Sequence, residues 1–132
     1  MREFGTFHVA KPAPEAFELF TPSGERRWAP GWDPRFPEPP ADETAPGTVF
    51  TTLHSGHETV WVVTAREQGG FIAYARVTPN ERAGTIEVRC VDLGDGTTRV
   101  EVTSDLTPLD GAKLESYAAY LSRWERLIAE VV

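Results

Sequence analysis

The sequence is nearly devoid of cysteine, and a single Cys90 excludes an internal disulfide within these 132 residues. Cys90 alternates with apolar residues in a strand-like segment, which predicts a small buried hydrophobic residue and not a nucleophile. A chain of this length can bury one sizeable core without disulfides or metals. We therefore expect one domain over residues 1–132, with no metal and no cofactor.

Long hydrophobic runs are also missing, because no window reaches the roughly 18 consecutive apolar residues that a membrane-spanning helix needs. The first residues, from Met1 to Gly5, lack the apolar stretch of a signal peptide. Both absences predict a cytoplasmic protein without a membrane span.

Positive charge is scarce: 13 Lys and Arg stand against 20 Asp and Glu, which gives a net charge of −7. The basic residues do not gather into a block that could follow a phosphate backbone. Nucleic-acid binding is therefore not expected. The composition, 40% hydrophobic and 25% charged, is that of a globular domain.

More than half of the prolines fall between Pro30 and Pro46. Proline lacks an N–H and restricts the residue before it, so this stretch is predicted to be a loop. Before it, we expect a strand over Arg2–Val9 and short helices over 12–20 and 24–28. After it come five segments rich in Val, Thr, Ile and aromatic residues, which predict strands over 48–54, 57–65, Phe71–Thr78, 84–91 and 97–106.

Turn residues separate these strands at positions 55–56, 79–80 and 94–96, as in an antiparallel meander. The last segment, 110–132, predicts a long helix with Asp110 as its N-cap. Its apolar residues recur at three- and four-residue spacings and form one stripe: Leu114, Tyr117, Leu121, Trp124, Ile128 and Val131.

Strand parity predicts which side chains face this helix. The turn at 55–56 pairs Phe50 with Trp61, and the turn at 94–96 pairs Val88 with Val102. The loops on either side of the strand predicted over Phe71–Thr78 then pair Trp61 with Tyr74, and Tyr74 with Ile86. The resulting inner face consists of Phe50, Trp61, Val63, Ile72, Tyr74, Arg76, Ile86, Val88, Cys90, Val100, Val102 and Ser104.

The order of these elements resembles the START-related SRPBCC superfamily. The resemblance covers the whole chain and is carried by residues 13–20, 28–34, 47–50 and 59–64 and by the terminal helix. Members include birch-pollen-allergen-like proteins, polyketide cyclase/dehydratase-like proteins and activators of the heat-shock chaperone ATPase. The resemblance implies an α+β helix-grip fold, in which a curved six-stranded antiparallel sheet wraps a long C-terminal helix. It also implies a cavity for a hydrophobic or amphipathic molecule, entered past the two short helices.

Tyr74 and Arg76 are the most informative polar residues, because parity places a phenol and a guanidinium inside an apolar concavity. The alternative is that Arg76 lies near the strand end and pairs with an acidic neighbour. Together with the implied cavity, parity and the helical stripe predict these ligand-binding residues: Trp28, Trp32, Phe50, Trp61, Tyr74, Arg76, Ile86, Val88, Val102, Tyr117, Leu121 and Trp124.

Two further groups have structural alternatives. Trp28, Trp32, Asp33 and Arg35 lie where the resemblance implies the cavity mouth, although both tryptophans could equally be core. His54, His57 and Glu58 invite a metal interpretation, but parity turns Glu58 away and leaves no third ligand. No metal site is therefore expected at this hairpin.

No nucleophile elbow, phosphate loop or zinc spacing is present, so the sequence does not decide whether the protein is an enzyme. An acid–base pair such as Tyr74 with Arg76 or His54 could serve enolisation or dehydration. The sequence supports a protein that binds a hydrophobic small molecule, with polyketide cyclase/dehydratase-like activity as an extension. The alternative is a protein-interaction module similar to the chaperone-ATPase activators. A homodimer is left open.

Overall fold

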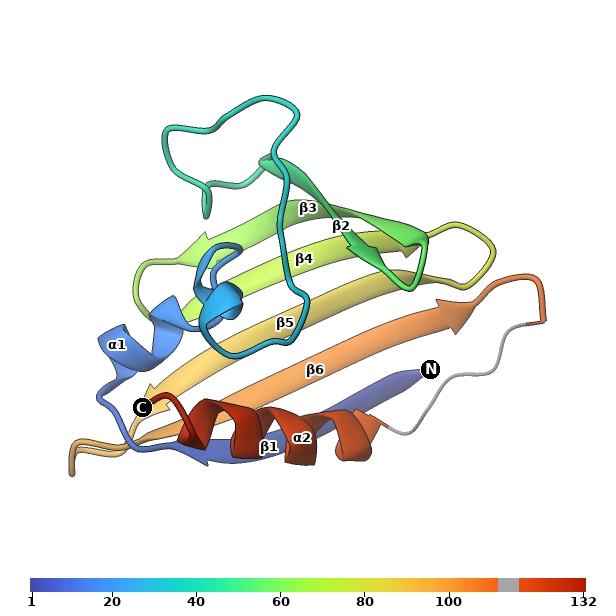
Figure 1. Cartoon of the computed structure of the whole chain (residues 1–132). Helices are drawn as coiled ribbons and strands as arrows, with labels where there is room; N and C mark the ends of the chain where they lie inside the picture. The colour runs from blue at the N-terminus through green and yellow to red at the C-terminus, as the bar shows by residue number, and fades with distance from the viewer. Residues whose placement is uncertain (112–116) are drawn as a thin grey trace.

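The computed structural model describes residues 1–111 and 117–132, the latter without the side chain of Tyr117 (Figure 1). The elements follow the predicted order: β1 Arg2–Val9, α1 Ala13–Glu18, the 3₁₀ turn η1 Gly24–Arg27, β2 Val49–His54, β3 His57–Glu67, β4 Phe71–Thr78, β5 Arg82–Asp92, β6 Thr98–Pro108 and α2 Tyr117–Ala129. The predicted Leu114 contact lies outside the described residues.

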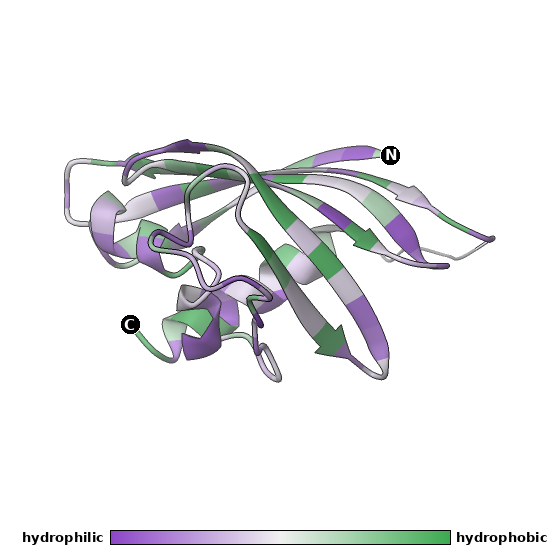
Figure 2. Cartoon of the chain, turned by 90° about the horizontal axis from the view of Figure 1, so that it is seen from above, coloured by the Kyte–Doolittle hydropathy of each residue, from purple (hydrophilic) through white to green (hydrophobic). Residues whose placement is uncertain are grey.

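The six strands form one antiparallel sheet in the order β1-β6-β5-β4-β3-β2. Helix α2, the two short helical segments and the long loop all lie on the concave side of the sheet (Figure 1). Apolar and polar residues alternate along the strands, as expected for a sheet with one buried face (Figure 2). The helix-grip α+β prediction is confirmed.

The β2–β3 hairpin has the predicted register, with Phe50 opposite Trp61. Its two turn residues, Ser55 and Gly56, have φ values of 49° and 80°. Positive φ at both central positions is the geometry of a type I′ turn, whose twist matches that of the strands.

The predicted pairing of Trp61 with Tyr74 is wrong. Trp61 lies opposite Arg76, and Val63 lies opposite Tyr74. The strands β3 and β4 extend to Glu67 and Phe71, and an irregularity between Val63 and Ala65 shifts the register. The error is two residues, so each side chain keeps its predicted face.

The start of the last helix also differs from the prediction. Asp110 and Gly111 have φ values of 54° and 73°, which no right-handed helix contains. Asp110 is therefore not the N-cap of a helix that begins at once, and the described helix α2 starts at Tyr117. It packs most closely on the edge strand β1, where Leu121 lies over Gly5.

The described residues contain no helix that is long and apolar enough to cross a membrane.

Candidate functional site

A cleft of about 660 Å³ opens between the concave face of the sheet, helix α2 and the segment that follows η1. Strands β3, β4 and β5 form its floor, and α2 forms one wall. Its lining includes the side chains of Glu25, Trp28, Trp32, Thr59, Trp61, Tyr74, Arg76, Thr78, Arg82, Ile86, Val88, Tyr120, Arg123 and Trp124.

Aromatic rings make up much of this lining. The rings of Trp32 and Trp61 meet edge to face at 5.5 Å between centroids, and those of Trp28 and Trp124 meet in the same way at 5.5 Å. Trp61 is stacked parallel on Phe50 at 5.8 Å. These contacts lock the rings into one arrangement, so the apolar wall is preformed.

Three of the four tryptophans that line the cleft use their N–H within the protein. The three indole nitrogens donate to Leu19 O at 2.7 Å from Trp28, to Pro22 O at 2.7 Å from Trp32, and to Thr52 Oγ1 at 2.9 Å from Trp61. A ligand is therefore met by ring faces and edges and not by these donors.

The side chain of Arg76 lies over one of the aromatic rings that line the cleft. Its guanidinium carbon lies 4.8 Å from the centroid of the Trp61 ring, within the range of a cation–π contact. Its Nη2 donates to Thr78 Oγ1 at 2.7 Å, and this hydroxyl shares a 2.6 Å hydrogen bond with Thr59 Oγ1. Arg76 is thus held in the cleft by its own strand and by the neighbouring ring.

Arg82 is a second cleft arginine, which the sequence analysis did not identify. It opens β5 opposite Thr78 and is half-buried. Its Nε is buried, and no donor–acceptor partner for it is found among residues 1–111 and 117–132. Its position follows from parity, since Arg82 shares the inner face with Ile86, but the sequence prediction began this strand two residues later.

Tyr74 is buried, and its hydroxyl donates to Phe20 O at 2.9 Å. Burial raises the pKa of Tyr74 well above its ordinary value, and the negative charges of Glu25 and Glu43 raise it further. The phenol therefore stays neutral and ties the sheet to the end of α1. This removes the basis for Tyr74 as half of an acid–base pair with Arg76 or His54.

Glu25 is the titratable group that sequence reasoning missed. It lies in η1 and lines the cleft, and burial raises its pKa well above the usual carboxyl range. In the described part of the chain, no donor hydrogen bonds to its carboxylate. The run Glu25-Arg26-Arg27 has the pattern of a solvated helical turn, so no signal in the sequence marks Glu25 as inward-facing.

The predicted site residues fall into three groups. Those on the cleft wall are Trp28, Trp32, Trp61, Tyr74, Arg76, Ile86, Val88 and Trp124. Phe50 and Val102 are fully buried and do not line the cleft, and the Phe50 ring lies among those of Trp32, Phe36, Trp61 and Tyr74. Leu121 faces β1 instead, and the Tyr117 side chain lies outside the described residues.

The remaining predicted features are peripheral. Asp33 pairs with Arg26 at 3.1 Å and with Arg35 at 3.7 Å on the surface, so the expected charged pair does not line the cleft. His54 and His57 face each other across the hairpin at the cleft mouth and are exposed. Among the described residues, no three His, Cys, Asp or Glu side chains are grouped to hold a metal ion.

Cys90 is buried, as predicted. It is not among the residues that line the cleft. Burial raises the pKa of its thiol to about 12, which keeps it in the unreactive protonated form.

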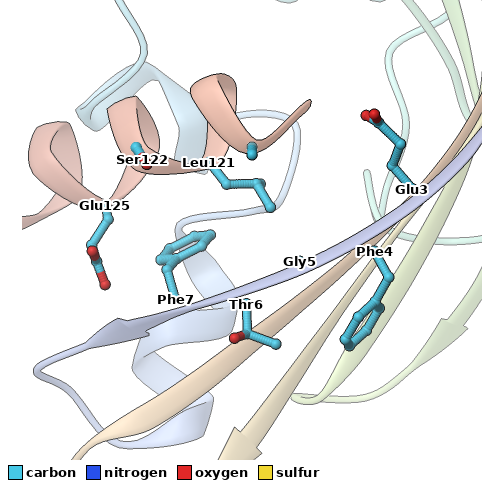
Figure 3. Close-up of a pocket in the computed structure, with 9 residues that line it drawn as sticks. Glu3, Phe4, Gly5, Thr6, Phe7, Leu121, Ser122 and Glu125 are labelled. Atoms are coloured by element: carbon cyan, nitrogen blue, oxygen red, sulfur yellow. The ribbon is translucent and has the colours of Figure 1, made fainter. Parts of the chain in front are cut away.

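A second hollow of about 420 Å³ lies between β1 and α2 (Figure 3). Leu121 and Phe7 face one another across it, whereas Phe4 and Thr6 point to the other side of the strand (Figure 3). Its charged side chains, Glu3 and Glu125, are both acidic, and Glu125 Oε2 accepts a 2.9 Å hydrogen bond from His8 N. We regard this hollow as the helix–strand seam and the larger cleft as the candidate site.

Comparison with solved structures finds the same architecture in proteins of low sequence identity. Ara h 8.0201 has a TM-score of 0.71 at 12% identity, over 99% of this chain and 97% of that one. CalU16 from Micromonospora echinospora has a TM-score of 0.68 at 17% identity, over 97% and 76%. Norcoclaurine synthase from Thalictrum flavum has a TM-score of 0.65 at 11% identity, over 98% and 87%.

No family model and no curated protein matches the sequence. Fold, element order and sheet topology thus agree with these structures, although their sequences differ from this one at more than four positions in five. The chain therefore has the same helix-grip fold as these solved structures.

Proposed function

We propose that this protein binds a hydrophobic or amphipathic small molecule in the cleft bounded by β3–β5, α2 and η1. The observation that carries the proposal is an open interior of about 660 Å³ with an aromatic wall and an inward-facing Arg76. This size and this mixture of apolar lining with a few polar groups are typical of small-molecule sites. The fold of the solved neighbours is compatible with such a site.

The first experiment is native mass spectrometry of freshly purified protein, which reports a retained ligand as added mass. It also reports the oligomeric state and so tests the homodimer. Titration with a fatty-acid-like or planar apolar probe should quench tryptophan emission, because all four tryptophans of the chain line the cleft. No retained mass and no quenching would contradict the proposal.

Arg76→Leu tests how the ligand is oriented. The substitution keeps an apolar wall but removes a charge-assisted contact, which is typically worth about 1.5 to 3 kcal/mol. Anionic probes should therefore lose more affinity than neutral probes of the same shape. Equal losses for both would mean that Arg76 acts only by packing on Trp61.

Glu25 favours a second candidate function, which is polyketide cyclase/dehydratase-like chemistry on the bound molecule. Burial raises the pKa of the Glu25 carboxyl, so this group holds its proton to higher pH than an ordinary carboxyl and can supply it to a carbonyl or a leaving hydroxyl. Turnover of a β-hydroxy ketone that binds the cleft should be lost in Glu25→Gln while binding persists. Binding without turnover in the parent protein would limit the function to ligand carriage.

The interaction module similar to the chaperone-ATPase activators is the competing proposal. Such a module would be expected to have a filled interior. The open cleft of this protein supports ligand binding instead. Failure of every probe to bind would favour the interaction module.

A further inference from the structure

Among the ionisable side chains that line the cleft, Glu25 and Arg82 have opposite charge types and are not used by the fold. No hydrogen bond or ion pair within the described part of the chain involves the side chain of Glu25 or that of Arg82. Buried polar groups in folded proteins nearly always have partners, because an unpaired one loses its hydration without compensation. Both groups are therefore available to a ligand.

Glu25 and Arg82 lie near different points along strand β4. The charge of Glu25 is felt at Tyr74, whereas Arg82 lies opposite Thr78. Tyr74 and Thr78 are four residues apart on β4, which corresponds to about 13 Å along a strand. Burial alone raises the pKa of Glu25, with no opposing contribution from an arginine, which agrees with this separation.

The chemistry of each group selects a different partner. The Arg82 guanidinium offers only donors in a planar fork, which suits a carboxylate. Burial raises the pKa of the Glu25 carboxyl and so favours its protonated form, which presents one O–H donor. Glu25 thus suits a carbonyl or hydroxyl oxygen. Between them, Trp61 and Ile86 provide an apolar surface.

We propose that the cleft takes an elongated apolar carboxylic acid that carries a carbonyl or hydroxyl oxygen remote from its carboxylate. The carboxylate of the ligand pairs with the guanidinium of Arg82, and the remote oxygen of the ligand accepts a hydrogen bond from the carboxyl of Glu25. This inference rests on the proposed function and specifies its ligand class.

The test compares dodecanoic acid, an oxododecanoic acid with its ketone near the far end, and dodecanol. Affinities are measured by calorimetry and tryptophan quenching. The oxo acid should bind the parent protein about two- to tenfold more tightly than dodecanoic acid, as one neutral hydrogen bond allows. Glu25→Ala should abolish that preference, whereas Glu25→Gln should keep it because the amide still donates.

Arg82→Gln should weaken both acids about ten- to a hundredfold and leave dodecanol unchanged, since it removes the charge-assisted contact alone. Two surface substitutions serve as matched controls. Glu18→Ala removes an exposed carboxyl from α1, and Arg89→Gln removes an arginine that pairs with Glu67 at 3.0 Å, away from the cleft. Both should leave every affinity unchanged, and melting curves confirm that each variant is folded.

A ketone preference that survives Glu25→Ala would overturn the inference, as would equal effects of Arg82→Gln on acids and alcohol. Tighter binding of an aminododecanoic acid, lost in Glu25→Gln, would also overturn it, because Glu25 would then act as an anion toward a cation. In each of these results a probe still binds, so the proposed function stands. Only the absence of binding by all probes would remove both.

Discussion

The two halves of the interior share one sheet but differ in how completely their inward-facing side chains are buried. On the side of β1 and β6, Phe7, Val100, Val102 and Leu121 are almost wholly buried, although the smaller hollow at the helix–strand seam touches Phe7 and Leu121. On the side of β3 and β4, the inward residues include Arg76 and Thr78, and a cleft separates them from α2. The filled half is built from Val, Leu and Phe, whereas the open half combines aromatic rings with polar groups.

We expect the filled half to contribute most of the stability and the open half to contact a ligand. An enclosed aliphatic core stabilises a domain in proportion to the apolar area that it removes from water. Rings that remain in contact with a void add little to that stability, and so do Glu25 and Arg82, whose side chains make no ion pair with the residues that the structure describes. Their presence on one half only marks the part of the interior that is available to a ligand.

The largest effect is expected in the filled half. Leu121→Asp places a carboxylate against Gly5 and Phe7, where no cation is found among the described residues. The loss of packing together with an unpaired buried charge should lower the free energy of unfolding by about 3 to 5 kcal/mol or more. Ser122→Asp, on the exposed face of the same helix turn, should change it by less than about 0.5 kcal/mol. Equal melting of the two variants would contradict the packing of α2.

A matched pair of substitutions sharpens the comparison, because Val88 and Val102 lie directly opposite one another on β5 and β6. Val102 is fully enclosed, whereas Val88 lines the cleft. Val102→Leu should overpack the filled half and cost about 1 to 3 kcal/mol in urea unfolding. Val88→Leu should be nearly neutral for stability but weaken probe binding, since the added methylene enters the cleft. The opposite ranking would mean that the cleft is closed in solution.

The filled half was largely predictable from the sequence, and the open half only in outline. Alternation and turn residues determine which face each strand buries, so Phe50, Val88 and Val102 were placed correctly. Even the misjudged β3–β4 register left Trp61 on the inner face. Parity cannot show whether an inward residue meets another side chain or a void, because that depends on how far α2 lies from the sheet. For this reason Phe50 and Val102 were predicted as ligand contacts and are core.

Glu25 could not be predicted because its inward position depends on tertiary structure. Its neighbours Arg26 and Arg27 are exposed, as the local sequence suggests, but the hydrogen bond from Trp28 Nε1 to Leu19 O ties the end of the turn to the residues that follow α1. Arg82 was missed for a simpler reason, since the strand was expected to begin at Gly84. Element ends are the least certain part of a sequence-based prediction.

Glu25→Gln should show a smaller effect that depends on pH. Below the ordinary carboxyl pKa, both the folded and the unfolded chain hold the proton, and Glu25 makes no difference to pH dependence. Above it, the unfolded chain ionises while the raised pKa keeps the folded carboxyl protonated, so the parent loses stability until the folded group ionises too. Glu25→Gln should therefore melt a few degrees higher than the parent at neutral pH but not at about pH 4. The exposed Glu18→Gln should show no such pH-dependent difference, and a constant offset would contradict the raised pKa of Glu25.

The smallest effect is expected at the hairpin that closes the open half. His54 and His57 face each other across the turn, while Glu58 lies opposite Leu53 on the other face of the strand. Zinc in a structural site takes four ligands, and this hairpin supplies two exposed imidazoles without a third group on their face. The double substitution of both histidines by Ala should shift the melting temperature by no more than a degree or two, because exposed side chains contribute little to stability. A chelator should leave the parent unchanged, since no bound ion couples to its folding. A chelator-induced fall in melting temperature that disappears in the double variant would establish a metal site at the mouth of the cleft and assign these histidines to the open half.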